Sequence, residues 1–186
     1  MAEIGHNGGP SLTGGTGWHR FVWQKARADL LPTLPIEVVR NRVKRAAELG
    51  LPYKTYASVR AQTGHDLIGF LFSNNALRLL KSDPLPADRS QVLQRINADR
   101  TALVHRPMDP TRVAGLAELD AAYIAPKLMG SWAGARDHLK SIVRDRGGAG
   151  DRFMLIGEGD LEHEWVAAGG LAGFVSGDTY FAGASL

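Results

Sequence analysis

The amino-acid sequence predicts an α/β fold that is dominated by helices and contains a small, mainly parallel sheet of three or four strands. Three short apolar segments support this prediction, at residues 67–72, 153–156 and 171–175. Stretches with helical spacing of apolar residues separate them, and such alternation favours parallel strands joined by helices. The first segment is almost continuously apolar, as in a parallel strand covered on both faces. A buried helix can have the same composition, so an all-α fold with buried loops is the alternative.

The helices are expected from the spacing of apolar residues and from the residues that end each stretch. Pro32 and Pro35 separate the first two helices, and Gly50 and Gly64 end the second and third. For residues 101–105 the pattern fits either the end of a helix or a short strand. The tail from residue 176 has no strong pattern. In chain order, the expected helices cover residues 18–31, 36–49, 53–62, 75–80, 88–104, 111–128, 131–144 and 161–168.

Length and composition indicate one domain with an N-terminal extension. The chain has 186 residues, of which 44% are hydrophobic and 22% charged, and this is ordinary for a globular protein with a proper core. Residues 1–17 are rich in glycine and are expected to form a flexible arm. Within them, residues 4–10 resemble the openings of bacterial and phage-encoded proteins. Residues 18–64 are expected to form a basic helical region, packed as one domain with an α/β core at residues 65–186.

Two absences limit the chemistry of the chain. It has no cysteine, which excludes disulfides, thiolate nucleophiles and Cys-based zinc sites. No apolar run approaches the roughly 20 residues that span a bilayer, and the first residues lack the pattern of a secretory signal. We therefore expect a cytoplasmic protein without a membrane partner.

The charge is distributed unevenly along the chain. Residues 19–61 hold nine Lys and Arg against three acids, whereas residues 150–186 hold one Arg against six acids. A basic half of this kind can face a polyanion, or it can dock on the acidic part of the same chain or of a second copy. Nucleic acid, a protein partner and a homo-oligomer are therefore all open as partners.

Residues 42–61 carry the strongest nucleic-acid signal. Ala46 and Gly50 lie four residues apart between two expected helices, and the stretch resembles the helix-turn-helix elements of bacterial repressors. The resemblance implies that Tyr56 and Val59 pack inward while the second helix contacts DNA. An ordinary αα-hairpin with a structural role has the same pattern. The residues expected to contact nucleic acid are Arg42, Arg45, Lys54, Thr55, Ser58 and Arg60.

An acidic segment at residues 153–175 is the second candidate site. A strand that ends just before Glu158 is followed by Glu162 and a helix, which is similar to the last motif of the haloacid-dehalogenase-like phosphohydrolases. In that family, acids at these positions hold magnesium, a cation that prefers oxygen ligands. The family also has two aspartates after its first strand, where this chain has Ser73 and Asn75, so the resemblance implies a fold without Asp-based phosphoryl transfer. Solvated acids that complement a helix dipole are the alternative.

The preferred interpretation is a non-enzymatic nucleic-acid-binding or regulatory protein that needs no cofactor. The first alternative is a catalytically degenerate dehalogenase-like fold, in which Ser73, Asn75, Glu158 and Glu162 form a ligand or magnesium site at one sheet edge. The second alternative is a structural subunit whose N-terminal arm becomes ordered on a protein partner. Enzymatic activity is less favoured because the chain has no P-loop, GxSxG or HExxH motif.

Overall fold

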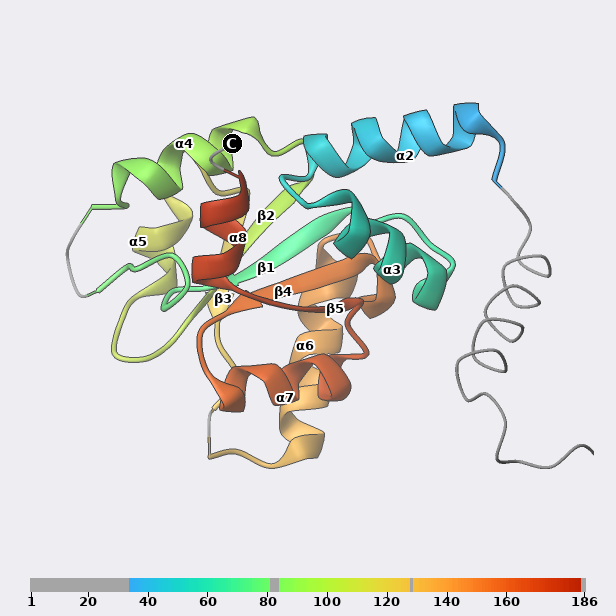
Figure 1. Cartoon of the computed structure of the whole chain (residues 1–186). Coiled ribbons are helices and arrows are strands. Elements are labelled where there is room, and N and C mark those ends of the chain that lie inside the picture. The colour runs from blue at the N-terminus through green and yellow to red at the C-terminus, as the bar shows by residue number, and fades with distance from the viewer. Residues whose placement is uncertain (1–33, 81–83, 128, 185–186) are drawn as a thin grey trace, which may run out of the picture. The chain divides into compact units, whose positions relative to one another are not determined.

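The centre of the fold is a parallel sheet, seen in a computed structural model that describes residues 34–80, 84–127 and 129–184. Residues 40–186 form one unit around a five-stranded, all-parallel sheet in the order β3-β2-β1-β4-β5 (Figure 1). The α/β prediction is confirmed, and the sheet has slightly more strands than expected. The arm expected at residues 1–17 and the helix expected at residues 18–31 lie outside the described residues.

The strands form where short apolar segments can be covered on both faces. The central strand β1 is buried along its whole length, as its continuous apolar sequence predicts. The apolar segments expected as strands became β1, β4 and β5, and the open segment at residues 101–105 became part of β2. The strand bounds are Gly69–Ser73 for β1, Asp99–Val104 for β2, Ala121–Ile124 for β3, Phe153–Gly157 for β4 and Gly173–Ser176 for β5.

Two layers of helices cover the sheet. Phe70 and Phe72 face the layer that contains α4, α5, α8 and the α2–α3 hairpin, whereas Leu71 faces α6 and α7. None of the described helices has both the length and the apolar character that a bilayer-spanning helix requires. The helix bounds are Ile36–Glu48 for α2, Tyr53–Thr63 for α3, Ala87–Arg95 for α4, Pro110–Ala114 for α5, Trp132–Asp145 for α6, Asp160–Gly169 for α7 and Gly177–Ala184 for α8.

Three expected helices are wrong in whole or in part. The helix expected at residues 111–128 is only the short α5, followed by β3, because pairing with β2 outweighs the helix preference of the alanines. The helix expected at residues 88–104 ends at Arg95, where extended backbone leads into β2. Residues 75–80 form turns, because Asn74 Nδ2 bonds the Leu79 carbonyl and Arg78 has a φ of +53°. Within the tail that lacked a pattern, residues 177–184 form α8.

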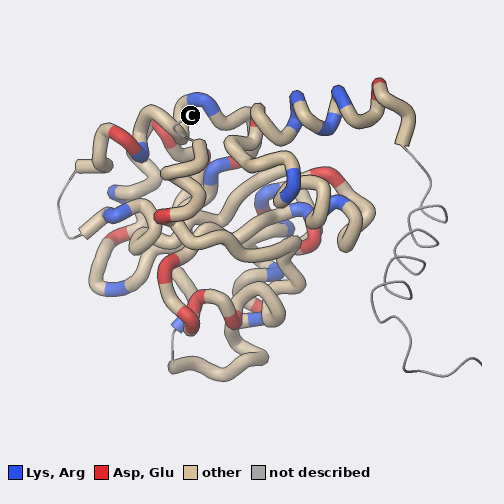
Figure 2. Tube along the Cα trace, viewed as in Figure 1, with Lys and Arg blue, Asp and Glu red and all other residues tan. Residues whose placement is uncertain are grey.

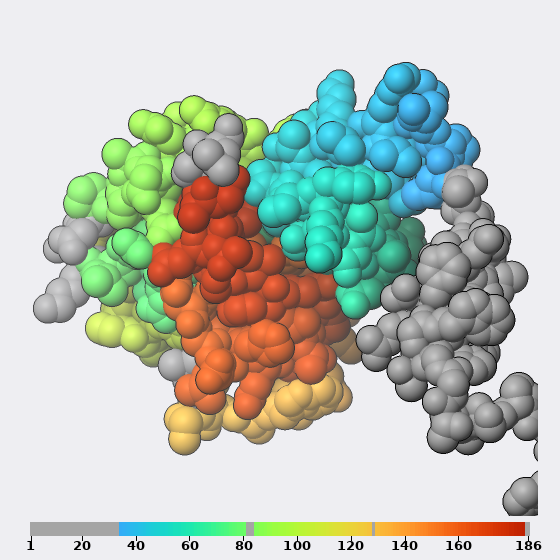
Figure 3. Space-filling view, in the orientation of Figure 1, coloured from blue at the N-terminus to red at the C-terminus, as the bar shows by residue number. Residues whose placement is uncertain are grey.

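The α2–α3 hairpin is anchored to the C-terminal helix α8. Tyr180 donates its hydroxyl hydrogen to the Leu49 carbonyl at 2.8 Å, and both residues belong to the core. Gly50, with φ +65°, makes the turn, and a Cβ there would lie 3.2 Å from the Tyr180 hydroxyl oxygen. The space-filling view shows the hairpin (cyan) beside α8 (red) (Figure 3).

Candidate functional site

Polar side chains gather where the central strands end. The strand order reverses between β1 and β4, and in open α/β sheets ligands bind beyond the carboxyl ends of strands at such a reversal. Ser73 ends β1, His105 directly follows β2, and Glu158 directly follows β4. Glu162 lies in the first turn of α7. This edge of the sheet is therefore the first place to look for a site.

Glu162 is a buried carboxylate that accepts hydrogen bonds on both of its oxygens. Its side chain is 2% exposed. Oε1 lies 2.8 Å from both Asn75 Nδ2 and His105 Nε2, and Oε2 accepts the Glu158 backbone N–H at 2.8 Å. The close approach requires Gly157, because a Cβ at that position would lie 2.6 Å from Oε2. Burial alone would raise the pKa of Glu162, but hydrogen bonds from these groups and from Ser73 lower it below its ordinary value.

His105 is a neighbour of Glu162 that is partly open to the solvent. Its side chain is 15% exposed, its backbone N–H bonds Asn74 Oδ1 at 2.8 Å, and its ring lies 5.4 Å from the Trp165 ring. Since Glu162 is an ionised acceptor, the imidazole Nε2 carries the proton of their shared hydrogen bond. Nδ1 has no hydrogen-bond partner among the residues that the structure describes, so this nitrogen is available to a ligand.

A cavity of about 1050 Å³ opens beside His105. Its walls are the loops after β1, β2 and β3 together with the first turn of α6, whose N-cap Ser131 accepts the Gly134 N–H at 3.1 Å. The ionisable side chains of the lining are all basic, since its described part contains no Asp or Glu, and Asn75 and Ser131 add uncharged polar groups. The first turn of α6 adds the partial positive charge of a helix N-terminus. The basic lining side chains are His105, Arg106, Lys127 and His138.

A second charged cluster at the same edge is occupied by contacts within the chain. Arg89 is 3% exposed, donates to Asp178 at 3.0 Å and lies over the Phe181 ring at 4.1 Å, which ties α4 to α8. Arg78 donates to the same Asp178 oxygen at 2.7 Å. Burial and the charge of Asp178 raise the pKa of Glu158. Because the arginines already share a carboxylate, this cluster serves chiefly to hold the C-terminal helix.

The structure brings together the four residues of the expected acidic site. Ser73, Asn75, Glu158 and Glu162 lie within one hydrogen-bonded network at the carboxyl edge. The network does not fit a magnesium site, because both Glu162 oxygens already accept N–H groups and Ser73 Oγ accepts the Ala76 N–H. No cluster of metal-ligating side chains is found within the described residues. Magnesium binding stays a prediction of the family resemblance.

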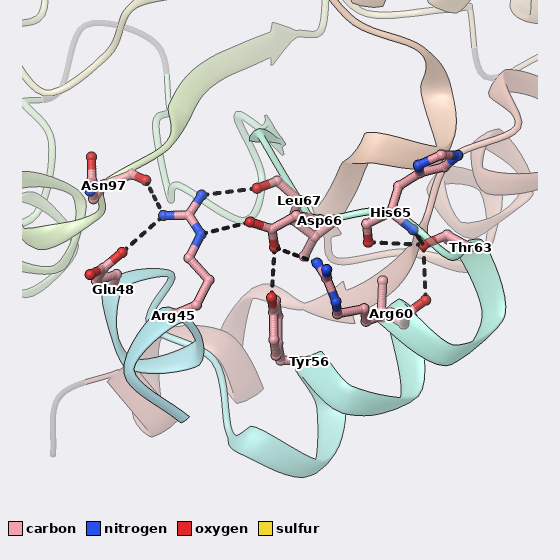
Figure 4. A network of polar contacts seen from close by, with 10 residues as sticks. Arg45, Glu48, Tyr56, Arg60, Thr63, His65, Asp66, Leu67 and Asn97 are labelled. Atoms are coloured by element: carbon pink, nitrogen blue, oxygen red, sulfur yellow. Dashed lines mark hydrogen bonds and ion pairs between the residues drawn. The ribbon is translucent and has the colours of Figure 1, made fainter. Parts of the chain in front are cut away.

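Two residues of the expected nucleic-acid site, Arg45 and Arg60, are held by contacts within the chain. Arg45 donates to Asp66 at 3.1 Å and to the Leu67 carbonyl at 3.0 Å, and Arg60 lies 3.6 Å from Asp66 (Figure 4). Tyr56 also donates to Asp66, at 2.7 Å, and burial together with this bond raises the pKa of the phenol.

The rest of that set lies nearer the solvent. Lys54 and Ser58 are exposed on α3, whereas Arg42 and Thr55 are half-buried. Lys and Arg line α2 (Figure 2). The residues of the expected nucleic-acid site lie before the start of β1, whereas the network around Glu162 lies beyond its end. The two groups are therefore at different edges of the sheet.

Of the residues that line the cavity, sequence reasoning named Asn75 and missed the basic ones. His105 and His138 are isolated along the chain, and Lys127 fell within an expected helix. A signal was present for His105, because it is the last residue of the alternative strand at residues 101–105. Its pairing with Glu162, 57 positions away, had no sequence signature.

No protein-family model, curated protein or solved structure matches this chain.

Proposed function

We propose that this protein binds an anionic small molecule in the cavity at the carboxyl edge of the sheet. The observation that carries the proposal is the one-sided charge of the cavity. Arg106 and Lys127 line it together with two histidines and the first turn of α6, and the described lining offers no carboxylate in return. Elsewhere in the described unit, Arg45, Arg89 and Arg146 each have an acidic partner within 4 Å.

General principles support an anion as the ligand. The N-terminus of a helix presents free N–H groups and a partial positive charge, and phosphates and carboxylates bind there. The site also lies beyond the carboxyl ends of parallel strands, where ligands of α/β proteins bind. A volume of about 1050 Å³ is at the upper end of the range for small-molecule pockets.

Calorimetric titration of the full chain with phenyl phosphate at low salt tests the proposal. Arg106→Ala and Lys127→Ala should each weaken binding by roughly three- to fivefold, because an exposed charge pair contributes up to about 1 kcal/mol. Arg144→Ala is the matched control, since Arg144 is exposed in the last turn of α6 and does not line this cavity. Absence of binding, or equal losses in all three variants, would overturn the proposal.

Nucleic-acid binding by the α2–α3 hairpin is the second candidate function. The observation that favours it is that Tyr56 and Val59 are buried while Lys54 and Ser58 are exposed on the same helix, as a recognition helix requires. Arg45 and Arg60 are engaged by Asp66, so the cationic contribution would come mainly from Arg42 and Lys54. This is why we rank the candidate second.

A further inference from the structure

The cavity is larger than a simple anion needs. Inorganic phosphate fills only a small part of about 1050 Å³, and small-molecule sites normally enclose most of their ligand. A ligand that matches the site must therefore carry a sizeable body beside its anionic group. The chemistry of that body can be inferred from the remaining lining.

The remaining lining is apolar except for Asn75 and Ser131. Asn75 Nδ2 is already bonded to Glu162, and Ser131 Oγ accepts the Gly134 N–H. The apolar side chains of the lining are Ile124, Ala125, Pro126, Met129 and Ala135. A sugar or another polar body would need hydrogen-bonding partners that these side chains lack, because burying a polar group without a partner is costly. An apolar body would instead gain free energy in proportion to the area removed from water.

Two exposed hydrophobic side chains line the same cavity, and a third lies close to them in the sequence. Ile124 is 39% exposed and Met129 is 92% exposed, and both are lining residues. Trp132, 56% exposed, directly follows the lining residue Ser131. Large exposed apolar patches often mark binding surfaces. Ile124 and Met129 continue the apolar part of the cavity to the solvent.

We propose that the ligand is an anion joined to an apolar body, as in an aryl or alkyl phosphate or carboxylate. This inference rests on the proposed function and specifies its ligand class. The anionic group is bound by Arg106, Lys127 and the first turn of α6. The apolar body packs on Ile124, Met129 and the neighbouring small residues.

Three probes with different bodies test the inference, each titrated into the full chain by calorimetry. They are inorganic phosphate, phenyl phosphate and glucose 6-phosphate, which has a polar body. Phenyl phosphate should bind roughly tenfold or more tightly than the other two, from burial of its ring. If inorganic phosphate binds and phenyl phosphate binds no more tightly, the inference is overturned and the proposed function stands. If none of the probes binds, the proposed function fails as well.

A variant at the cavity mouth separates the two parts of the ligand. Met129→Ser should weaken phenyl phosphate binding by roughly three- to fivefold, since contact area is lost, and should leave inorganic phosphate binding unchanged. Val43→Ser is the matched control, because Val43 is an exposed apolar residue of α2, 47% accessible, that does not line the cavity. Equal weakening of both probes by Met129→Ser would contradict a separate apolar subsite.

Discussion

The two edges of the sheet carry polar networks of opposite character. At the amino edge, Arg45 and Arg60 share Asp66, which also accepts the hydroxyl of Tyr56 (Figure 4). At the carboxyl edge, the buried Glu162 is bound by neutral or backbone donors and by His105. The cations Arg106 and Lys127 face a cavity there, with no acid in its described lining.

This difference shows at which edge the basic side chains are available to bind a ligand. Arg45 joins α2 to the residues that precede two strands, because it bonds the carbonyls of Leu67 and Asn97 as well as Asp66. The Arg45 guanidinium therefore bonds groups of the same chain and stabilises the fold. At the carboxyl edge, Glu162 is fixed by its hydrogen bonds, whereas Arg106 and Lys127 have no acidic partner among the residues that the structure describes. We therefore expect changes at the amino edge to affect stability alone, and changes at the carboxyl edge to affect binding as well.

The largest expected effect is that of Glu162→Ala on stability. The variant leaves Asn75, His105 and the Glu158 N–H without their buried acceptor, and we expect the free energy of unfolding to fall by about 3 kcal/mol. Urea unfolding followed by far-UV circular dichroism measures it. Glu164→Ala, an exposed position on the same helix, should change stability by less than about 0.5 kcal/mol. Similar losses for the two variants would show that the network contributes nothing specific.

Arg45→Ala should have the next largest effect. It removes hydrogen bonds to a carboxylate and to two carbonyls, and we expect a loss of about 2 kcal/mol in the free energy of unfolding. Phenyl phosphate binding should be unchanged in the folded variant, because Arg45 belongs to the opposite edge. Lys44→Ala is the control on the same helix, since Lys44 is exposed. Weaker anion binding in Arg45→Ala would break the division between the two edges.

Acid should weaken the carboxyl-edge network through Glu162. The pKa of Glu162 is lowered in the folded protein from an ordinary value of 4.5. The ionised carboxylate therefore stabilises the folded state at a pH above 4.5, and this stabilisation is lost as the pH falls through the lowered pKa. The difference in free energy of unfolding between wild type and Glu162→Gln should therefore narrow below pH 4.5. Urea titrations from pH 6 downward measure it, at intervals chosen to bracket the transition. A difference that stays constant with pH would show that the charge of Glu162 is not what stabilises the fold.

The smallest expected effect concerns the exposed face of α3. Lys54→Ala should change stability by less than about 0.5 kcal/mol, because the side chain is exposed. If the hairpin contacts DNA phosphates, the variant should reduce the slope of log affinity against log salt by about 0.9. Mobility-shift titrations at several salt concentrations measure the slope, with Lys140→Ala on α6 as the control. No retardation of duplex DNA at low salt would leave the hairpin as an anchor for the amino edge.

Much of the architecture could be predicted from local sequence. The segments that became β1 and β4 are almost wholly apolar, and burial on both faces selects that composition. The hairpin could be anticipated from Gly50, which adopts the left-handed backbone that its position requires. β3 could not, because Ala121 and Ala122 suit a helix equally well and only pairing with β2 decides between the two.

By itself, the sequence determined the fold class, the buried strands and the grouping of Ser73, Asn75, Glu158 and Glu162 at one sheet edge. These follow from apolar periodicity and from the rule that parallel strands end on the same side. Only the tertiary structure decided which charges remain available. Arg45 and Arg60 are basic residues like Arg106 and Lys127, but Asp66 lies against the first pair and a cavity lies against the second. Whether a cation has a partner depends on side chains that are distant in sequence, which local pattern does not encode.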